Sequence, residues 1–364
     1  MRSCTVVPDD VGDCAAKLSR DQTKSGRMVH QTKGRVAMAR ALRVVQVGCG
    51  GRAQAHLAAM QASGAVDVVA ICDLDATKLH ETADRFGIAA RYTDMAEAIG
   101  AHRPELVDIV TPAHIRLGIV EAAVRAGAPA ILIEKPMALS ATECDALVRL
   151  GADRLIAVNT QYRWMTHWQA VWKLLRQEAL GTVRAIRVST GVNLLEQGPH
   201  VLDLAMHAAE LCGWGNPEWV MAQCVGQEFF GANAVPADTS AVIGYGDNRL
   251  WLNAGPSAPP VPGESVIWYQ QQVEIIGDRG RIWVSLNQGW TLWRNGRIRQ
   301  GTTGWPADDG VAQQALFVDL RRVLHAKGDR WRSFATGVAI AAQRQRVMDG
   351  CIRSAAENTR VQVL

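Results

Sequence analysis

The sequence predicts an α/β fold in which a doubly wound parallel sheet is followed by an α+β half built on a mostly antiparallel open sheet. Short apolar runs alternate with helical segments from residue 42 to about residue 133, which is the pattern of a parallel sheet with helical crossovers. After about residue 158, short alternating strands are separated by Gly, Asn-Gly and Pro turns, as in antiparallel sheets. The 364 residues also exceed what one hydrophobic core usually organises.

We therefore expect an N-terminal extension (1–40), a first domain (41–158) and a second domain (159–364) whose last helix could pack back on the first domain. Apolar and β-branched runs predict strands in the first domain at 42–47, 66–72, 106–111 and 130–133, and helices between them at 52–63, 76–86 and 115–126. In the second domain, helices are expected at 162–177, 200–211, 313–324 and 337–355, and strands at 183–188, 240–245, 249–254, 266–276, 281–286 and 290–293.

The composition is that of an ordinary globular protein, with 48% hydrophobic and 20% charged residues, which excludes disordered, collagen-like and disulfide-scaffold proteins. The net charge of +4 arises in residues 1–40, which carry eight basic and four acidic residues, whereas the rest of the chain has 31 of each. A neutral body gives no reason to expect a nucleic-acid partner. No apolar stretch reaches the ~18 residues that a membrane helix needs, so no membrane partner is expected either.

Residues 1–40 lack hydrophobic periodicity and the apolar segment of a signal peptide. We expect a disordered extension or translation from an upstream start, with Met28 or Met38 as the true beginning. The eight cysteines are scattered and form no CxxC pair, a usage that indicates reduced thiols, a cytoplasmic location and no metal site.

A glycine-rich turn follows the first predicted strand and opens the first helix. Gly48 allows a tight turn, Gly50 and Gly51 let the backbone approach a pyrophosphate, and Arg52 begins the helix whose free amides favour phosphate. Asp73 ends the second strand and is placed to accept both ribose hydroxyls of NAD. The pattern favours NAD over NADP; the alternative role for Asp73 is the N-cap of the helix that follows.

The sequence Glu134-Lys135-Pro136 directly follows the apolar strand at 130–133. The carboxyl end of such a strand faces the ligand crevice. A lysine there can polarise or protonate a substrate oxygen, and its pKa falls when it is desolvated. The alternative is a surface lysine before a turn proline.

Further segments match one family in order along the chain: 92–94, 107–112, 126–127, 161–163, 181–183, 198–203, 276–280 and 344–355. With the glycine turn and Glu134-Lys135-Pro136, this set resembles the Gfo/Idh/MocA oxidoreductases, named for glucose–fructose oxidoreductase and inositol dehydrogenase. Only residues 1–40 lie outside the resemblance.

The resemblance implies a Rossmann domain that binds NAD(P) and an α+β domain that carries substrate and oligomer contacts. The implied activity is NAD(P)-dependent hydride transfer to or from a secondary alcohol or ketone of a sugar, inositol or related polyol. Thr111, Pro112, Glu134 and Lys135 would contact the cofactor together with the glycine turn. Pro136 is expected to follow a cis bond, and the protein is expected to be a homodimer or homotetramer.

Two registers compete for the histidine that accompanies the lysine in this family. Aligning the glycine of the family motif with Gly198 selects His200, with Asp203 after it and Glu196 in place of the family's first aspartate. The other register selects His207. Because proline suits the first turn of a helix, we expect the helix to begin near Gly198 and prefer His200 at its mouth.

The mechanism that the resemblance implies gives each residue a role. His200 removes the hydroxyl proton, Lys135 stabilises the developing alkoxide, and Glu196 or Asp203 fixes the histidine tautomer. Arg163 matches a frequent arginine of the family and would either bind substrate oxygens or form a salt bridge at the domain junction. Arg116 would contact cofactor or an anionic substrate, or be a solvated helix residue.

Tryptophans suggest covered surfaces in the second domain. Trp164, Trp168 and Trp172 recur every four residues, a helical stripe more typical of core or subunit interface than of a sugar site. Further tryptophans on the predicted strands would form an apolar sheet face, which supports a homo-oligomer.

Two other functions remain open for this architecture. One is redox-neutral glycoside cleavage, in which NAD oxidises the sugar transiently; the other is a non-catalytic NAD(P)-binding sensor. The pairing of Lys135 with His200 favours an enzyme, because a sensor has no need for an acid/base pair.

Overall fold

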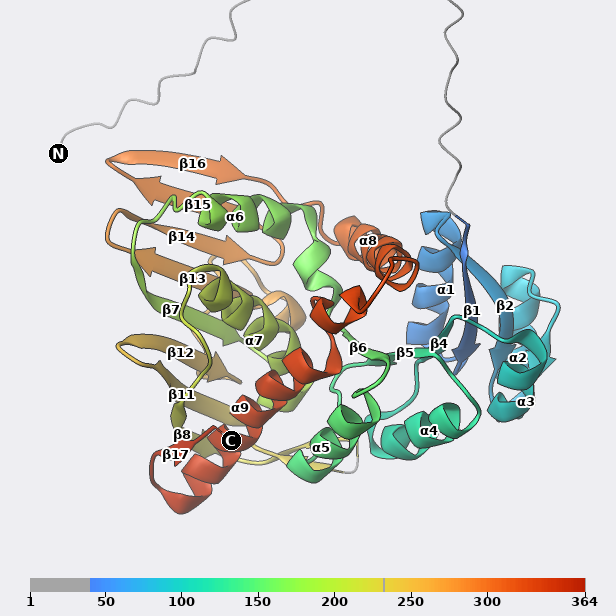
Figure 1. Cartoon of the computed structure of the whole chain (residues 1–364). Coiled ribbons are helices and arrows are strands. Elements are labelled where there is room, and N and C mark those ends of the chain that lie inside the picture. The colour runs from blue at the N-terminus through green and yellow to red at the C-terminus, as the bar shows by residue number, and fades with distance from the viewer. Residues whose placement is uncertain (1–39, 232, 364) are drawn as a thin grey trace, which may run out of the picture. The chain divides into compact units, whose positions relative to one another are not determined.

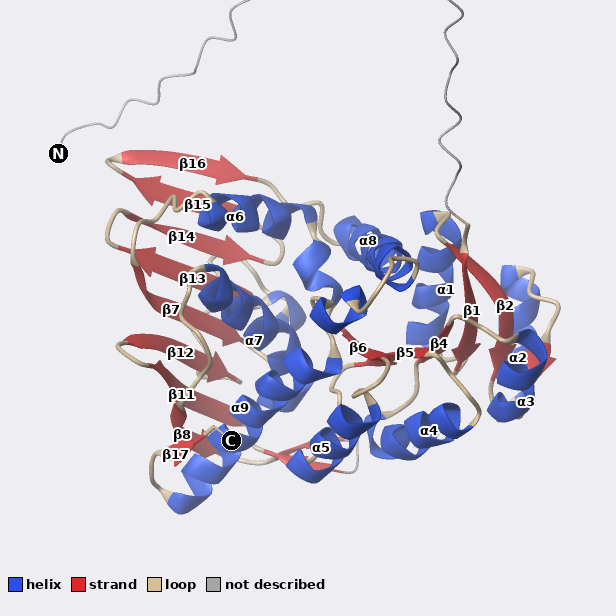
Figure 2. Cartoon of the chain, viewed as in Figure 1, coloured by secondary structure: helices blue, strands red, loops and turns tan. Residues whose placement is uncertain are grey.

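The computed structural model describes residues 40–231 and 233–363, so the extension expected over residues 1–40 lies outside it except for Arg40. Two sheets organise the described part, as Figures 1 and 2 show. The first sheet consists of β1 (Leu42–Val47), β2 (Val66–Cys72), β3 (Arg91–Tyr92), β4 (Leu106–Ile109), β5 (Ala130–Glu134) and β6 (Leu155–Asn159). All its strands are parallel and lie in the order β3-β2-β1-β4-β5-β6, which is the Rossmann order.

Helices cover both faces of this sheet. One face packs against α3 (Met95–His102), α4 (Ala113–Arg125) and α5 (Ala141–Leu150), and the other against α1 (Gly51–Ser63) with α2 (Ala76–Phe86) beside it. Two helices from the end of the chain complete the cover: α8 (Ala307–Leu324) lies beside α1, and the start of α9 (Val338–Glu357) packs near α5. The buried strands are rich in Val, Ile and Leu because both faces are covered.

The second sheet is mixed and has nine strands in the order β16-β15-β14-β13-β7-β12-β11-β8-β17, of which only the β7–β12 pair is parallel. Its strands are β7 (Val183–Thr190), β8 (Trp219–Val225), β11 (Asp238–Tyr245), β12 (Asn248–Ala254), β13 (Gln271–Gly277), β14 (Gly280–Ser285), β15 (Gly289–Arg294), β16 (Arg297–Gly301) and β17 (Val361–Gln362). A separate hairpin joins β9 (Glu228–Phe230) and β10 (Asn233–Val235). The predicted fold class, a Rossmann sheet followed by a mostly antiparallel α+β half, is confirmed.

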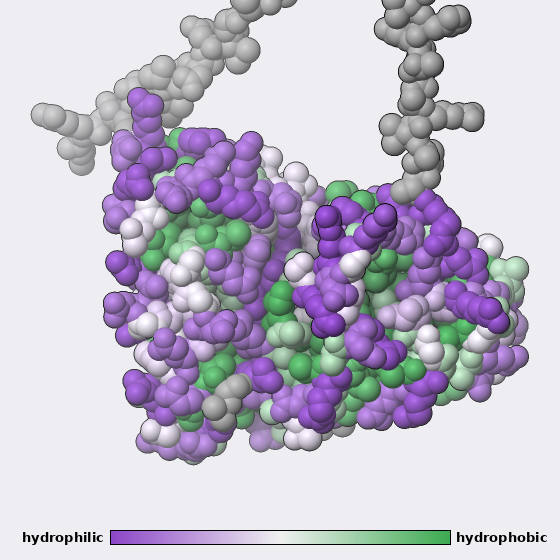
Figure 3. Space-filling view, viewed as in Figure 1, coloured by the Kyte–Doolittle hydropathy of each residue, from purple (hydrophilic) through white to green (hydrophobic). Residues whose placement is uncertain are grey.

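One face of the second sheet packs against α6 (Thr166–Arg176), α7 (Leu194–Leu211) and α9, which bury a single large core. Trp168 and Trp172 stack within this core at 4.8 Å. The opposite face carries exposed apolar side chains such as Met221, Trp251 and Ile298. On the side of the molecule seen in Figure 3, hydrophobic residues form small areas within a mostly hydrophilic surface.

Three boundary predictions for the second half were wrong in ways that shape the site. The predicted helix at 162–177 is broken by the short helix η1 (Gln161–Trp164), so Trp164 lies off the stripe, and η2 (Ile267–Tyr269) replaces the first part of the strand predicted at 266–276. Helix α8 begins six residues earlier than predicted, at Ala307, which brings Asp309 toward the first sheet. A last short helix, η3 (Arg330–Ser333), follows α8.

Helix α7 begins at Leu194 rather than near Gly198, because the side chain of Asn193 caps it by accepting from the Glu196 amide at 2.9 Å. Pro199 therefore lies inside the helix, where a proline is usually unfavourable because it has no N–H to donate. His200 sits in the second turn of the helix rather than at its mouth.

Candidate active site

The glycine turn has the geometry that a dinucleotide needs. Gly48 has a φ of +99°, and a Cβ there would come within 2.3 Å of the Val110 carbonyl oxygen, so only glycine fits. No atom lies within 4 Å of an ideal Cβ at Gly50 or Gly51, so the start of α1 is open. No side chain caps this helix and its first turn carries no acidic residue, which leaves the amides and the positive end of the dipole available to phosphate.

Asp73 lies beside this turn and does not cap the helix that follows. Its carboxylate accepts the Cys49 amide at 2.7 Å and the Asp75 amide at 2.8 Å. Asp75 is the N-cap of α2, accepting from the Lys78 amide at 3.1 Å. A cavity of about 430 Å³ opens in front of Asp73, and its other walls include Gly48, Gly50, Leu74, Thr111, Pro112 and Ile115. Asp73 thus faces the space that an adenosine ribose would occupy.

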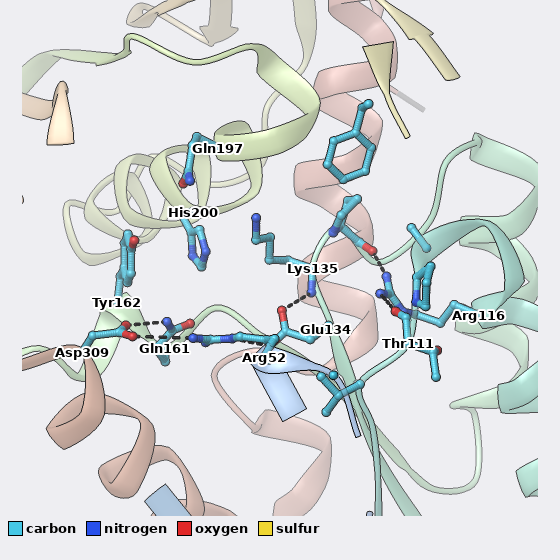
Figure 4. A pocket seen from close by; sticks show the side chains of 17 residues that line it. Arg52, Thr111, Arg116, Glu134, Lys135, Gln161, Tyr162, Gln197, His200 and Asp309 are labelled. Atoms are coloured by element: carbon cyan, nitrogen blue, oxygen red, sulfur yellow. Dashed lines mark hydrogen bonds and ion pairs between the residues drawn. The ribbon is translucent and has the colours of Figure 1, made fainter. Parts of the chain in front are cut away.

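A second cavity of about 560 Å³ adjoins the first, since both are lined by Gly50, Val110, Thr111 and Pro112. Residues from both halves of the chain line it, among them Glu134 of β5, His200 of α7 and Asp309 of α8, as Figure 4 shows. Its remaining lining residues are Gly51, Arg52, Ala113, Arg116, Glu134, Lys135, Pro136, Gln161, Tyr162, Gln197, His200, Phe230 and Asp309. The two cavities thus lie next to each other at the carboxyl ends of the first sheet's strands.

Lys135 enters the second cavity from the end of β5. The Lys135–Pro136 bond is cis, as expected. The ammonium donates to the backbone carbonyl of Glu196 at 2.9 Å and extends toward the same space as His200 (Figure 4). Burial lowers the pKa of Lys135. The charges of Glu134 and Glu196 act to raise this pKa and those of Arg52 and Arg116 to lower it, and the net shift is downward. A lysine in this state exchanges protons closer to neutrality than a surface lysine.

His200 enters from α7 and is neutral in this environment. Its ring stacks on Tyr162 with centroids 4.1 Å apart and an angle of 14°. Burial, followed by the charge of Lys135, holds the pKa of His200 well below its ordinary value. Its Nδ1 is buried and has no hydrogen-bond partner among the described residues. His207 lies outside the cavity and contacts Glu210 at 3.0 Å.

The partners predicted for the histidine ring were wrong. Asp203 is buried, accepts from Arg163 at 2.5 Å and from Arg344 at 3.2 Å, and forms no hydrogen bond with the His200 Nδ1 atom. Burial alone would raise the pKa of Asp203, but Arg163 and Arg344 outweigh it and lower the pKa. Glu196 offers its backbone carbonyl to Lys135, while its neighbour Gln197 lines the cavity.

Arg163 and Arg116 each had two predicted roles, and the structure shows the contacts that each residue makes. Arg163 is buried in its ion pair with Asp203 and does not line the cavity; the salt bridge lies within the predicted second domain rather than at the domain junction. Arg116 is neither solvated nor free, because its guanidinium donates to the carbonyls of Pro136 and Thr111. Arg116 thus ties the turn after β4 to the cis-proline turn after β5.

Sequence reasoning missed several residues of the site. Tyr162, Gln197 and Phe230 line the cavity, and Asp309 reaches it because α8 begins early; it accepts from Gln161 at 2.6 Å. His56 is buried in α1, where its neighbours on the helix are apolar. A single histidine in such a position is ordinarily a packed core residue. No local motif marked these residues, because their partners come from distant parts of the chain.

Among residues 40–231 and 233–363, no group of three or more His, Cys, Asp or Glu side chains is arranged to hold a metal ion. Within the same ranges, none of the helices combines the length and the apolar character that crossing a membrane requires.

The strand order, the glycine turn and the acidic end of β2 define a dinucleotide-binding Rossmann domain followed by an α+β domain. Residues 42–160 match a family model described as an oxidoreductase family with an NAD-binding Rossmann fold. Over these residues the chain is similar to the Gfo/Idh/MocA oxidoreductases, whose Rossmann fold binds NAD.

Relatives agree with this assignment over part of the chain. D-apiose dehydrogenase of Paraburkholderia graminis is 36% identical over 147 residues, which are 39% of this chain and 38% of that protein. D-glucoside 3-dehydrogenase of Escherichia coli is 25% identical over 46% of this chain and 53% of its own length. The chain thus matches about two fifths to one half of the length of these curated relatives.

Solved structures share the whole fold at low sequence identity. An oxidoreductase from Agrobacterium radiobacter, in complex with NAD+, L-tartaric acid and magnesium, has a TM-score of 0.75 at 21% identity and covers 89% of this chain and 99% of its own. A levoglucosan dehydrogenase in complex with NADH has a TM-score of 0.74 at 20% identity, over 89% of this chain and 100% of its own.

Proposed function

We propose that this protein is an NAD-dependent oxidoreductase that transfers a hydride between the nicotinamide and a secondary alcohol or ketone of a sugar, inositol or related polyol. The observation that carries the proposal is the convergence of Lys135 and His200 in a cavity that adjoins the glycine turn. Relatives named for D-apiose, D-glucosides and levoglucosan support a carbohydrate-like substrate.

The proposed reaction gives the residues of the two cavities separate roles in cofactor binding and in proton transfer. The Gly48–Gly51 turn and Asp73 would hold the pyrophosphate and the adenosine ribose, while Thr111, Pro112 and Glu134 line the way to the second cavity. NAD, when bound, supplies the hydride acceptor. The neutral imidazole of His200 accepts the hydroxyl proton of the substrate, since its lowered pKa keeps it unprotonated near pH 7. The Lys135 ammonium stabilises the negative charge that develops on the substrate oxygen.

Charge pairing in the cavity supports an uncharged substrate. Arg116 donates to two backbone carbonyls, and Arg52 lies 3.1 Å from Glu134 and 3.5 Å from Asp309. Among the described lining residues, Lys135 and Arg116 are the cations with no carboxylate in salt-bridge contact, and Arg116 is held by its two backbone carbonyls. A sugar acid or sugar phosphate would bring an anion to a site whose arginines already donate to carboxylates or backbone carbonyls, whereas hydroxyl groups match Gln197, Gln161 and Tyr162.

The test is NADH formation measured by absorbance with NAD or NADP against a panel of inositols, neutral aldoses and ketoses, and the matching sugar acids. We expect stoichiometric NADH with a neutral compound, and kcat/KM lower by at least about tenfold for its acid. Product analysis separates this function from redox-neutral glycoside cleavage, which forms no net NADH. Nucleotide binding without sugar-dependent reduction of NAD, for every compound, would contradict the proposal and favour a sensor.

A further inference from the structure

A buried histidine lies beneath the candidate active site and bridges two strands. His56, in the middle of α1, is fully buried. Its Nδ1 lies 2.9 Å from Asp108 on β4, and its Nε2 lies 2.7 Å from Glu134 at the end of β5. The ring also meets Phe317 of α8 edge-on, with centroids 6.0 Å apart. His56 is therefore held from the helix side and from two neighbouring strand ends.

Both ring nitrogens of His56 must carry a proton in this arrangement, because ionised carboxylates only accept hydrogen bonds. Burial alone lowers the pKa of His56, but Asp108 and Glu134 outweigh it and raise the pKa to about 9. The Asn159 side-chain nitrogen of β6 also lies 2.9 Å from Nε2, and Arg52 of the same helix contacts Glu134. The pKa of Glu134 is lowered by Arg52 and His56 despite its burial, so the pair is ionic.

Glu134 connects this histidine to the lysine turn. One carboxylate oxygen accepts from His56, from Asn159 at 2.6 Å and from Arg52 at 3.1 Å. The other oxygen accepts the backbone amide of Lys135 at 3.2 Å. The carboxylate is thus anchored by donors from α1 and β6, and it holds the first peptide of the turn from which the Lys135 side chain enters the cavity.

We propose that His56 is a positioning residue: held between Asp108 and Glu134, it fixes the Glu134 carboxylate and so places the ammonium of Lys135 for the reaction. This inference rests on the proposed function. His56 does not line the cavity, so it acts through Glu134 rather than on substrate or cofactor. A misplacement of about 1 Å at a reacting group is enough to cost about a hundredfold in rate.

A purely structural role would have different consequences. If His56 only neutralised buried charge, the balanced variant His56→Leu/Asp108→Asn, which leaves Glu134 paired with Arg52, would recover both stability and turnover. If His56 positions Glu134, this variant recovers stability but not turnover, since leucine donates no hydrogen bond. The balanced variant also keeps the test valid where His56→Leu alone fails to fold.

The experiment measures melting temperature, NADH affinity by fluorescence, and kcat and KM for the best sugar. For the balanced variant we expect NADH affinity and sugar KM within about threefold of wild type and kcat lower by about tenfold to a hundredfold. Glu134→Gln should lower kcat similarly, and His56→Leu added to Glu134→Gln should cost nothing more. His325→Gln, a change at a histidine that pairs with Glu105 far from the cavity, serves as the matched control. A kcat within about twofold of wild type, or additive losses in the double variant, overturns the proposal.

A second readout separates this inference from the proposed function. The pH dependence of carbamylation of Lys135 by cyanate, followed by peptide mass spectrometry, reports the surroundings of the ammonium without turnover. A wild-type protein that reduces no NAD with any sugar refutes the proposed function. The positioning role stands if the Lys135 profile still differs between wild type and the balanced variant, and it falls if the two profiles coincide.

Discussion

His56 makes the stability of the folded protein depend on pH in a predictable direction. Its pKa rises from an ordinary 6.5 to about 9 in the fold. Each pKa unit corresponds to about 1.4 kcal/mol, so the protonated ring contributes about 3 kcal/mol to the free energy of unfolding. Because the folded state binds the proton more tightly, this contribution is complete below about pH 6.5 and is lost as the pH rises through about 9.

Urea unfolding of wild type and of His56→Leu/Asp108→Asn, between about pH 6 and about pH 10, measures this contribution. The cysteine thiols of the unfolded chain also titrate in this range, but both proteins contain the same cysteines, so the difference between the two unfolding free energies isolates the histidine pair. As the pH rises across this range, we expect the stability of wild type relative to this variant to fall by about 3 kcal/mol. A difference that does not change with pH would mean that His56 is neutral in the fold, and the ionic description of its contacts would be refuted.

Four further predictions concern the site. Lys135→Met should lower kcat by about 10²- to 10⁴-fold in the absorbance assay while NADH still binds; unchanged turnover would remove the lysine from the reaction. Asp73→Ser should lower the ratio of kcat/KM for NAD over NADP by at least about tenfold, because a carboxylate repels a 2′-phosphate. Arg163→Met should cost about 3–5 kcal/mol of unfolding free energy by leaving buried Asp203 with less compensation, whereas a raised sugar KM at unchanged stability would restore a substrate-binding role. The acid limb of kcat/KM should lie below about pH 6.5, since the pKa of His200 is lowered, and a limb at higher pH would contradict the neutral buried imidazole.

Short motifs were sufficient to predict where the residues proposed to hold the cofactor would lie in the fold. The glycine turn, Asp73 and the Glu134-Lys135-Pro136 turn each follow a strand directly in the sequence. Parallel strands with helical crossovers place all their carboxyl ends at one edge. Local order along the chain therefore determined which of these residues would lie near one another.

The substrate half depended on contacts between distant residues. The start of α7 was misplaced because Asn193 caps it despite Pro199 in the helix, and the ionic partners of Asp203 come from η1 and α9. Whether an arginine binds substrate or a buried carboxylate depends on the groups that the fold brings into contact with it. The residues next to it in the sequence do not predict those groups.

His56 shows the difference between what sequence patterns predict and what depends on tertiary contacts. The sequence by itself determined the Rossmann fold, the nucleotide turn and the lysine turn, because backbone conformation and strand order follow from patterns a few residues long. Only the tertiary structure decided that His56 meets carboxylates 52 and 78 residues away. Burial and pairing set the charge of such a group, and both exist only once the chain has folded.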